Sequence, residues 1–319
     1  MHLPPAEPEF YGGPQAGWLR NILDYLPRLQ ALVVSSLSFF DHQALQTVHP
    51  GSGAQAEERK YSLRLLIASS CENTTAGSLA FSLASFPDLM YLDLSSTQGS
   101  RSPSVLREIG NLTQLWVLKM RNCGLRDSDI KWLTFSTRLR SLDMSGNYLT
   151  EHGVSDLVEL LPKVRHRVDG HGNAGSYESS SRARSSKKPT LQSFVADKLT
   201  SSLDGHIYLE DRLPDSFSEL CLAGNLVTVD ELTGILTYPT LEYLDAGSLY
   251  CSRQPAELLS PDSPVPDRRR LSSTRVDELS PALFSKGFRN VRSLRMHHSV
   301  ITSRPFSGKG LPTAEQCFE

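Results

Sequence analysis

The sequence has no run of about 18 apolar residues, so it predicts no membrane-spanning helix. Its first twenty residues include Pro4, Pro5 and Pro8 but lack the apolar stretch that a secretory signal requires. Five cysteines are spread over 319 residues, with neither a CxxC pair nor the dense spacing of a disulfide-stabilised domain. These absences predict a reducing, intracellular setting. The location would be cytoplasmic or, if Arg268–Arg270 serve as an import signal, nuclear.

An excess of charge of one sign is also missing. The formal net charge is −2, so no overall field attracts nucleic acid or an anionic membrane. Nucleic acid is therefore not an expected partner. The hydrophobic content of 39% is ordinary for a globular chain and is enough to bury a core.

Common catalytic motifs are absent as well. The sequence contains no G-x-S-x-G, P-loop or H-E-x-x-H pattern. His297 and His298 are adjacent, and neighbouring side chains on a strand face opposite ways, so the two cannot bind one metal together. Gly308 and Lys309 come nearest to a phosphate loop, but Ser303 stands where its first glycine is needed. We therefore expect no enzyme activity, catalytic residue, cofactor, metal site or small-molecule substrate.

What the sequence does contain is an internal repeat. Residues 115–125 (LWVLKMRNCGL) and 139–149 (LRSLDMSGNYL) both match L-x-x-L-x-L-x-x-[NC]-x-L. Looser copies fit the same frame, most at intervals of 24 or 26 residues, and the longer intervals contain insertions. We count nine copies, which start at residues 29, 63, 89, 115, 139, 191, 217, 241 and 291. The copy at Leu191 is weaker and is counted because residues 189–196 parallel residues 239–246.

The motif resembles the leucine-rich repeat family, in its ribonuclease-inhibitor-like or cysteine-containing subclass. The resemblance implies an α/β solenoid, or horseshoe, with a parallel concave sheet and convex helices. It also implies that Asn147, Asn225, Cys71 and Cys123 hydrogen-bond turn backbone between neighbouring coils. Helix signals follow several copies, among them Ser102–Pro103 and the capping box of Thr228 and Glu231. We therefore expect residues 1–319 to form a single solenoid.

Two insertions interrupt the repeats. Residues 163–188 are rich in Gly, Ser, Lys and Arg without periodicity, and residues 251–279 contain Ser-Pro pairs and an arginine cluster, so both are expected to be disordered. Ser260 and Ser263 resemble proline-directed phosphorylation targets, and Ser272 resembles the target of a basophilic kinase. An unmodified, solvated loop fits residues 251–279 equally well.

The two ends of the chain leave its extent open. Residues 18–26 form an amphipathic pattern that fits either an N-terminal cap or the convex part of an upstream repeat, and only about 18 residues follow Ile301. Both a complete array and a piece of a longer one fit these ends.

In the resembled family the concave strand face is the usual binding surface. Because side chains alternate along a strand, the residues beside the inward leucines would face it. The early strands would place Val33, Leu65 and Ile67 there as an exposed apolar patch, covered by a partner, by the N-terminal segment or by a neighbour in a longer chain. The candidates for binding a partner are Tyr91, Asp93, Lys119, Arg121, Asp143, Glu219, Tyr243, Asp245 and Arg295.

These observations favour a non-catalytic, intracellular interaction module or scaffold that binds a protein partner. Two alternatives stay open through the resemblance. One is the substrate-recognition part of a ubiquitin ligase, although no F-box-like segment precedes the repeats. The other is a GTPase-activating protein, although no matching arginine motif is present.

Overall fold

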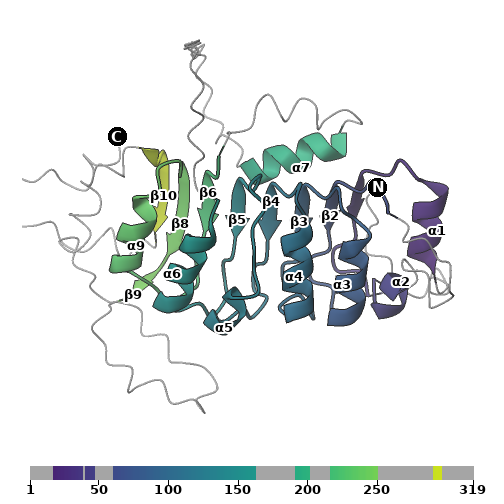
Figure 1. Cartoon of the computed structure of the whole chain (residues 1–319), viewed down its shortest axis with the longest axis horizontal. Coiled ribbons are helices and arrows are strands. Elements are labelled where there is room, and N and C mark those ends of the chain that lie inside the picture. The colour runs from purple at the N-terminus through teal and green to yellow at the C-terminus, as the bar shows by residue number, and fades with distance from the viewer. Residues whose placement is uncertain are drawn as a thin grey trace, which may run out of the picture.

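Eight strands form one all-parallel sheet in the order β1-β2-β3-β4-β5-β6-β8-β10. The computed structural model describes residues 17–38, 40–46, 60–162, 191–201, 216–250 and 290–296. Strand order follows chain order, and parallel neighbours need a crossover connection, so helices alternate with the strands (Figure 1). The expected α/β class with a parallel sheet is confirmed.

The strands begin where eight of the nine predicted copies place them. Each central leucine lies opposite the central leucine of its neighbour, as Leu92 does opposite Leu118 and Leu118 opposite Leu142. The strands are β1 (Ala31–Val33), β2 (Leu65–Ile67), β3 (Tyr91–Asp93), β4 (Val117–Lys119), β5 (Ser141–Asp143), β6 (Glu219–Cys221), β8 (Tyr243–Gly247) and β10 (Ser293–Met296).

Two helices begin at the start signals read in the sequence. Ser102 precedes a first-position proline in α4, and Thr228 and Glu231 form the expected capping box of α9, in which the amide of Thr228 donates to Glu231 Oε2 at 2.9 Å. The helices of this layer are α1 (Trp18–Tyr25), α2 (His42–Gln46), α3 (Ala76–Ala84), α4 (Pro103–Asn111), α5 (Asp127–Ile130), α6 (Glu151–Leu160) and α9 (Val229–Leu236).

The main core lies between the sheet and this row of helices. It contains the central leucines of the strands and the apolar face of each helix, for example Leu118 with Leu106 and Ile109 of α4, all at most 1% exposed. A strand of three residues buries only one side chain on this side. Each strand and the chain that follows it to the next strand, called a coil here, therefore depends on its neighbours for a continuous core.

A row of side chains at the ends of the strands links each coil to the preceding one. The thiol of Cys71 donates to the carbonyl of Val34 at 3.4 Å, and the thiol of Cys123 donates to that of Leu94 at 3.3 Å. The amide of Asn147 donates to Met120 at 2.8 Å. Asn225 donates to Met144, so the hydrogen bonds between coils that were expected of these four residues are confirmed. Thr97, which was not among them, makes the same kind of bond to Ala68.

One small sheet was not expected. β7 (Val227–Thr228) pairs in parallel with β9 (Leu249–Tyr250), beside the main sheet and next to α9.

The copy predicted at Leu191 is wrong. Leu191–Ser201 is a helix, α7, and β5 pairs directly with β6, with Leu142 opposite Leu220. The strand interpretation relied on the parallel with residues 239–246. However, Leu191, Phe194, Val195 and Leu199 also follow the helical spacing i, i+3, i+4 and i+8, and that period prevails.

Several predictions concern residues outside the described ranges. These are the two insertions at 163–188 and 251–279, the phosphorylation candidates Ser260, Ser263 and Ser272, and the histidine pair at 297 and 298. Among the described helices, none combines the length and the apolar character needed to cross a bilayer.

Candidate functional site

The side of the sheet that faces away from α1–α6 carries the residues that flank each central leucine. We call it the α7 face, because α7 lies across part of it (Figure 1). Every predicted binding candidate is on this face. Eight of the nine stand one residue before or after a central leucine, and Arg121 stands two residues beyond the end of β4. The face divides into an apolar half over β1–β4 and a polar half from β4 to β10.

The apolar half is covered by α7. Val195 is 0% exposed and Leu199 is 3% exposed, and they pack against Leu65, Tyr91 and Val117 in a cluster separate from the main core. The cluster also includes Met90 and Trp116, each just before a strand, and the partly buried Val33 and Ile67. The expected exposed patch is therefore covered by the chain itself.

None of the three covers that the sequence suggested is the one found. α7 lies in the chain between β5 and β6. The sequence predicted a loop at residues 163–188 and a repeat strand from Leu191 in this part of the chain. The sequence correctly predicted that this apolar surface is buried, because so large an apolar surface is rarely left exposed. It did not predict that α7 buries it.

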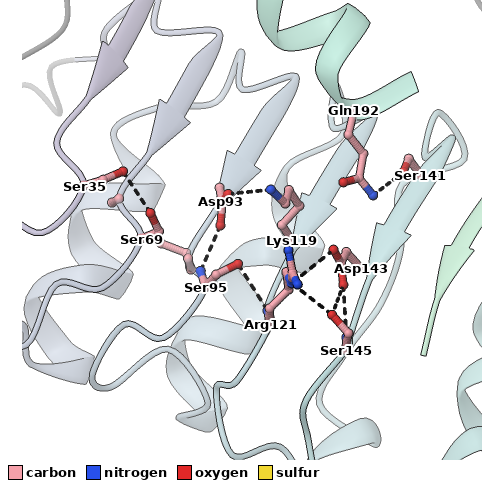
Figure 2. Close-up of polar contacts among 12 residues, drawn as sticks. Ser35, Ser69, Asp93, Ser95, Lys119, Arg121, Ser141, Asp143, Ser145 and Gln192 are labelled. Carbon is pink, nitrogen blue, oxygen red and sulfur yellow. Dashed lines mark hydrogen bonds and ion pairs between the residues drawn. The ribbon is translucent and has the colours of Figure 1, made fainter. Parts of the chain in front are cut away.

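The N-terminus of α7 is held by a buried carboxylate. The amide of Leu191 donates to Glu219 Oε1 at 2.6 Å, and the hydroxyl of Ser141 donates to Glu219 Oε2 at 3.1 Å. Gln192 Nε2 donates to Ser141 Oγ at 3.0 Å (Figure 2). Burial raises the pKa of Glu219, although these hydrogen bonds oppose the shift. A carboxylate at a helix N-terminus also interacts favourably with the helix dipole.

Charged pairs mark the middle of the face. Lys119 Nζ lies 3.0 Å from Asp93 Oδ2, and Arg121 Nε lies 3.6 Å from Asp143 Oδ2 and donates to Ser145 Oγ at 3.0 Å (Figure 2). Asp93 and Asp143 are only 5% and 4% exposed. Each also accepts the amide two residues further on, at 3.0 and 3.1 Å. These aspartates therefore fix the strand ends as well as pairing with cations.

The polar half is hollowed into a groove of about 440 Å³. The guanidinium of Arg295 lies over the ring of Tyr243, 5.7 Å from its centroid. Burial, with the neighbouring Cys221 and Asp245, raises the pKa of Tyr243 to about 12. Burial likewise raises the pKa of Asp245 and of the Cys221 thiol, so that this thiol is neutral at pH 7.

The structure brings six of the nine candidates together along this groove, namely Arg121, Asp143, Glu219, Tyr243, Asp245 and Arg295. Asp93 and Lys119 pair beside it. Tyr91 is 3% exposed beneath α7, where burial raises its pKa, so it is not available on the surface.

Gln192 lines the groove as well and was not among the candidates. It could have been found only by recognising the helical period of residues 191–199, because the strand interpretation placed its side chain elsewhere.

The groove offers ion-pairing and hydrogen-bonding groups next to an aromatic ring. Within the described part of the chain, no three His, Cys, Asp or Glu side chains are placed to hold a metal ion. We compared the sequence with protein-family models and with curated proteins, and neither comparison finds a match.

Proposed function

We propose that the chain is a leucine-rich-repeat solenoid that acts as a non-catalytic protein-interaction module. The proposal is supported by the recurrence of the motif and by the leucine register along the sheet. It is also supported by the row of Asn, Cys and Thr side chains that bond each coil to the preceding one. Cys71 and Cys123 act there as hydrogen-bond donors, which requires free thiols and favours a reducing compartment.

The proposed binding site is the groove of the polar half. The observation that carries the proposal is that six residues, predicted one by one from separate positions in the sequence, line one groove. Tyr243 and Arg295 are half-buried and exposed respectively, and such residues commonly anchor protein interfaces. The carboxylates behind them are held by hydrogen bonds, Glu219 from Ser141, Asp143 from the amide of Ser145, and Asp245 from the amide of Gly247 at 3.2 Å, so the site is ordered before a partner arrives.

The partner would be a protein segment that presents basic and hydrogen-bonding groups to the three carboxylates and an acidic or aromatic group to Arg121 and Arg295. Mixed charge of this kind contributes more to specificity and to the association rate than to affinity.

The test uses residues whose loss should not disturb the fold. The tagged full chain and a Tyr243→Ala/Arg295→Ala variant capture proteins from cells that express the native chain, with quantitative mass spectrometry as the readout. Arg292→Ala is the matched control, because Arg292 is an exposed arginine that pairs with Glu242 next to β10. We expect a partner to be recovered with wild type and control, and reduced about tenfold or more with the groove variant.

Equal recovery with all three proteins would move the binding site away from the groove. Recovery of no specific protein by any of them would contradict the interaction-module proposal itself. Charge reversal at Asp143 is unsuitable as a test, because Asp143 is buried and also caps the end of β5, so the change would destabilise the fold.

A further inference from the structure

α7 is an addition to the sheet and not a part of its core. Its apolar side chains form a cluster with residues of the α7 face, whereas the central leucines belong to the main core on the other side. β5 and β6 are paired residue by residue without it, from Ser141 opposite Glu219 to Asp143 opposite Cys221. The hydrogen bonding of the sheet therefore does not depend on α7.

The attachment of α7 is small and lies on one side of the helix. Only Val195 and Leu199 are fully buried, with Leu191, Phe194 and Ala196 partly so. Polar contacts join the first turn of α7 to the sheet, at Leu191 and Gln192. At the other end, the hydroxyl of the exposed Thr200 bonds within the helix, to the carbonyl of Ala196 at 2.8 Å.

The sequence gives α7 room to leave the face. Residues 163–190 separate it from the described part that ends at Pro162, and residues 202–215 separate it from the part that includes β6. At most ~3.5 Å per residue, these 28 and 14 residues span up to about 100 Å and 50 Å. Neither β5 nor β6 need move when α7 is displaced.

The contacts that α7 makes indicate what kind of helix could bind in its place. The apolar half fits two apolar side chains at i and i+4, the spacing of Val195 and Leu199 on one side of a helix. Glu219 of β6 lies beyond the apolar half, in the polar half, and accepts a backbone N–H from the first residue of α7. The first four N–H groups of any helix lack internal partners, so another helix can supply the same donor.

We propose that α7 is displaceable, and that the apolar half of the α7 face docks an amphipathic helix of a protein partner in exchange for α7. The helix would place apolar residues at i and i+4 over Leu65, Tyr91 and Val117, with its N-terminus at Glu219. This inference rests on the proposed function and adds to it the kind of partner and the intramolecular competitor that the partner must replace.

The first test is hydrogen exchange on the full wild-type chain, which requires no variant. Amides of α7 from Val195 to Ser201 should exchange through local opening, about a hundredfold or more faster than those of β3 and β4, relative to intrinsic rates. Val195→Ala should speed exchange in α7 about tenfold and leave β4 unchanged. Asp197→Ala, at an exposed position of α7, is the control and should change neither. Equal protection of α7 and β4, with both affected alike by Val195→Ala, would overturn the proposal.

The second test supplies α7 in trans. A fluorescent peptide of residues 190–202 is added to the full chain, wild type or Val195→Asp/Leu199→Asp, and anisotropy is measured. The variant should bind the peptide about tenfold or more tightly than wild type does, because its own helix no longer occupies the face. A peptide with the same two aspartates is the control and should not bind.

Three results would contradict the inference. The first is a folded variant, judged by circular dichroism, that does not bind the peptide. The second is equal binding of the peptide by wild type and variant. The third is a wild-type chain that exchanges α7 with a second copy and sediments as a dimer, since the occupant would then be another molecule of this chain. None of these three results bears on the groove proposal, which is tested separately by whether partner capture depends on Tyr243 and Arg295. The groove proposal can therefore hold even if this inference fails.

Discussion

Replacing Asn147 with alanine should be among the most destabilising single changes in this chain. Asn147 is 1% exposed, and its Oδ1 accepts the amides of Cys123 and Leu125, each at 3.0 Å. Its Nδ2 donates to the carbonyls of Met120 at 2.8 Å and Met144 at 2.7 Å. One side chain thus satisfies two donors and two acceptors that belong to two successive coils.

The magnitude follows from the groups that are left behind. A buried donor without a partner costs roughly 1–3 kcal/mol, so the two amides alone account for about 2–6 kcal/mol. Met144 keeps a second donor, Asn225, so its carbonyl adds little. We expect a loss of about 4 kcal/mol in the free energy of unfolding, a large part of the 5–15 kcal/mol typical of native proteins.

The assay is urea unfolding followed by circular dichroism, with Cys123→Ala as the matched control. Cys123 occupies the equivalent position one coil earlier, but its thiol is a weak donor, to Leu94 at 3.3 Å, so its loss should cost about 1 kcal/mol. A difference of less than about 1 kcal/mol between the two variants would refute the account of Asn147 as the bond between coils.

A second variant tests which atom matters. Asn147→Asp keeps the acceptor for Cys123 and Leu125 but places an oxygen against the carbonyls of Met120 and Met144. Only the protonated carboxyl can donate there, so this variant should regain stability as the pH falls from 7 to 5. The stability difference between wild type and Asn147→Ala should not follow that pH dependence.

Two further predictions concern Glu219 and the glycines. Burial raises the pKa of Glu219 above its ordinary 4.5, so its contribution to stability is full below about pH 4.5 and is lost as the pH rises through the raised pKa. Glu219→Gln, whose amide can still accept from Leu191 and donate to Ser141, should therefore gain stability relative to wild type between pH 4 and pH 7 in urea titrations. If the stability difference between Glu219→Gln and wild type did not change with pH, that would contradict a raised pKa of the buried Glu219 carboxyl. Gly99 has φ +79°, and a Cβ there would lie 2.8 Å from the backbone nitrogen of Ala76, whereas a Cβ on Gly77 in α3 meets nothing within 4 Å. Thermal melts should show Gly99→Ala losing about 2 kcal/mol or more and Gly77→Ala gaining about 0.5–1 kcal/mol, and equal effects would contradict the difference in backbone space.

The strands were predictable because their signal is local and repeated. Leucines such as Leu118 and Leu142 recur with the same neighbours at a constant interval, and the register follows, since equivalent positions in stacked coils lie side by side. The pairing of Asp93 with Lys119 is implied by that register, because the two residues stand opposite each other on β3 and β4.

The helix α7 could not be placed in this way. Val195 and Leu199 bury themselves against β1–β4, more than 70 residues earlier in the chain, and no local pattern specifies which distant surface a helix will cover. A short apolar run is also ambiguous in period, so residues 191–196 satisfied the strand frame as well as the helical one. Six residues of the groove were among the predicted binding candidates, but the groove itself was not predicted, because Gln192 of α7 forms part of its boundary.

The distance along the chain between β4 and α7 has a consequence during synthesis. β1–β4 are complete once Lys119 has been made, but the last residue of α7 follows 82 residues later, at Ser201. At about 5–20 residues per second, translation leaves the apolar half of the α7 face without its own cover for roughly 4–16 s. A chaperone or a partner helix that is present at the ribosome meets no internal competitor in that interval, whereas one that arrives later must displace α7.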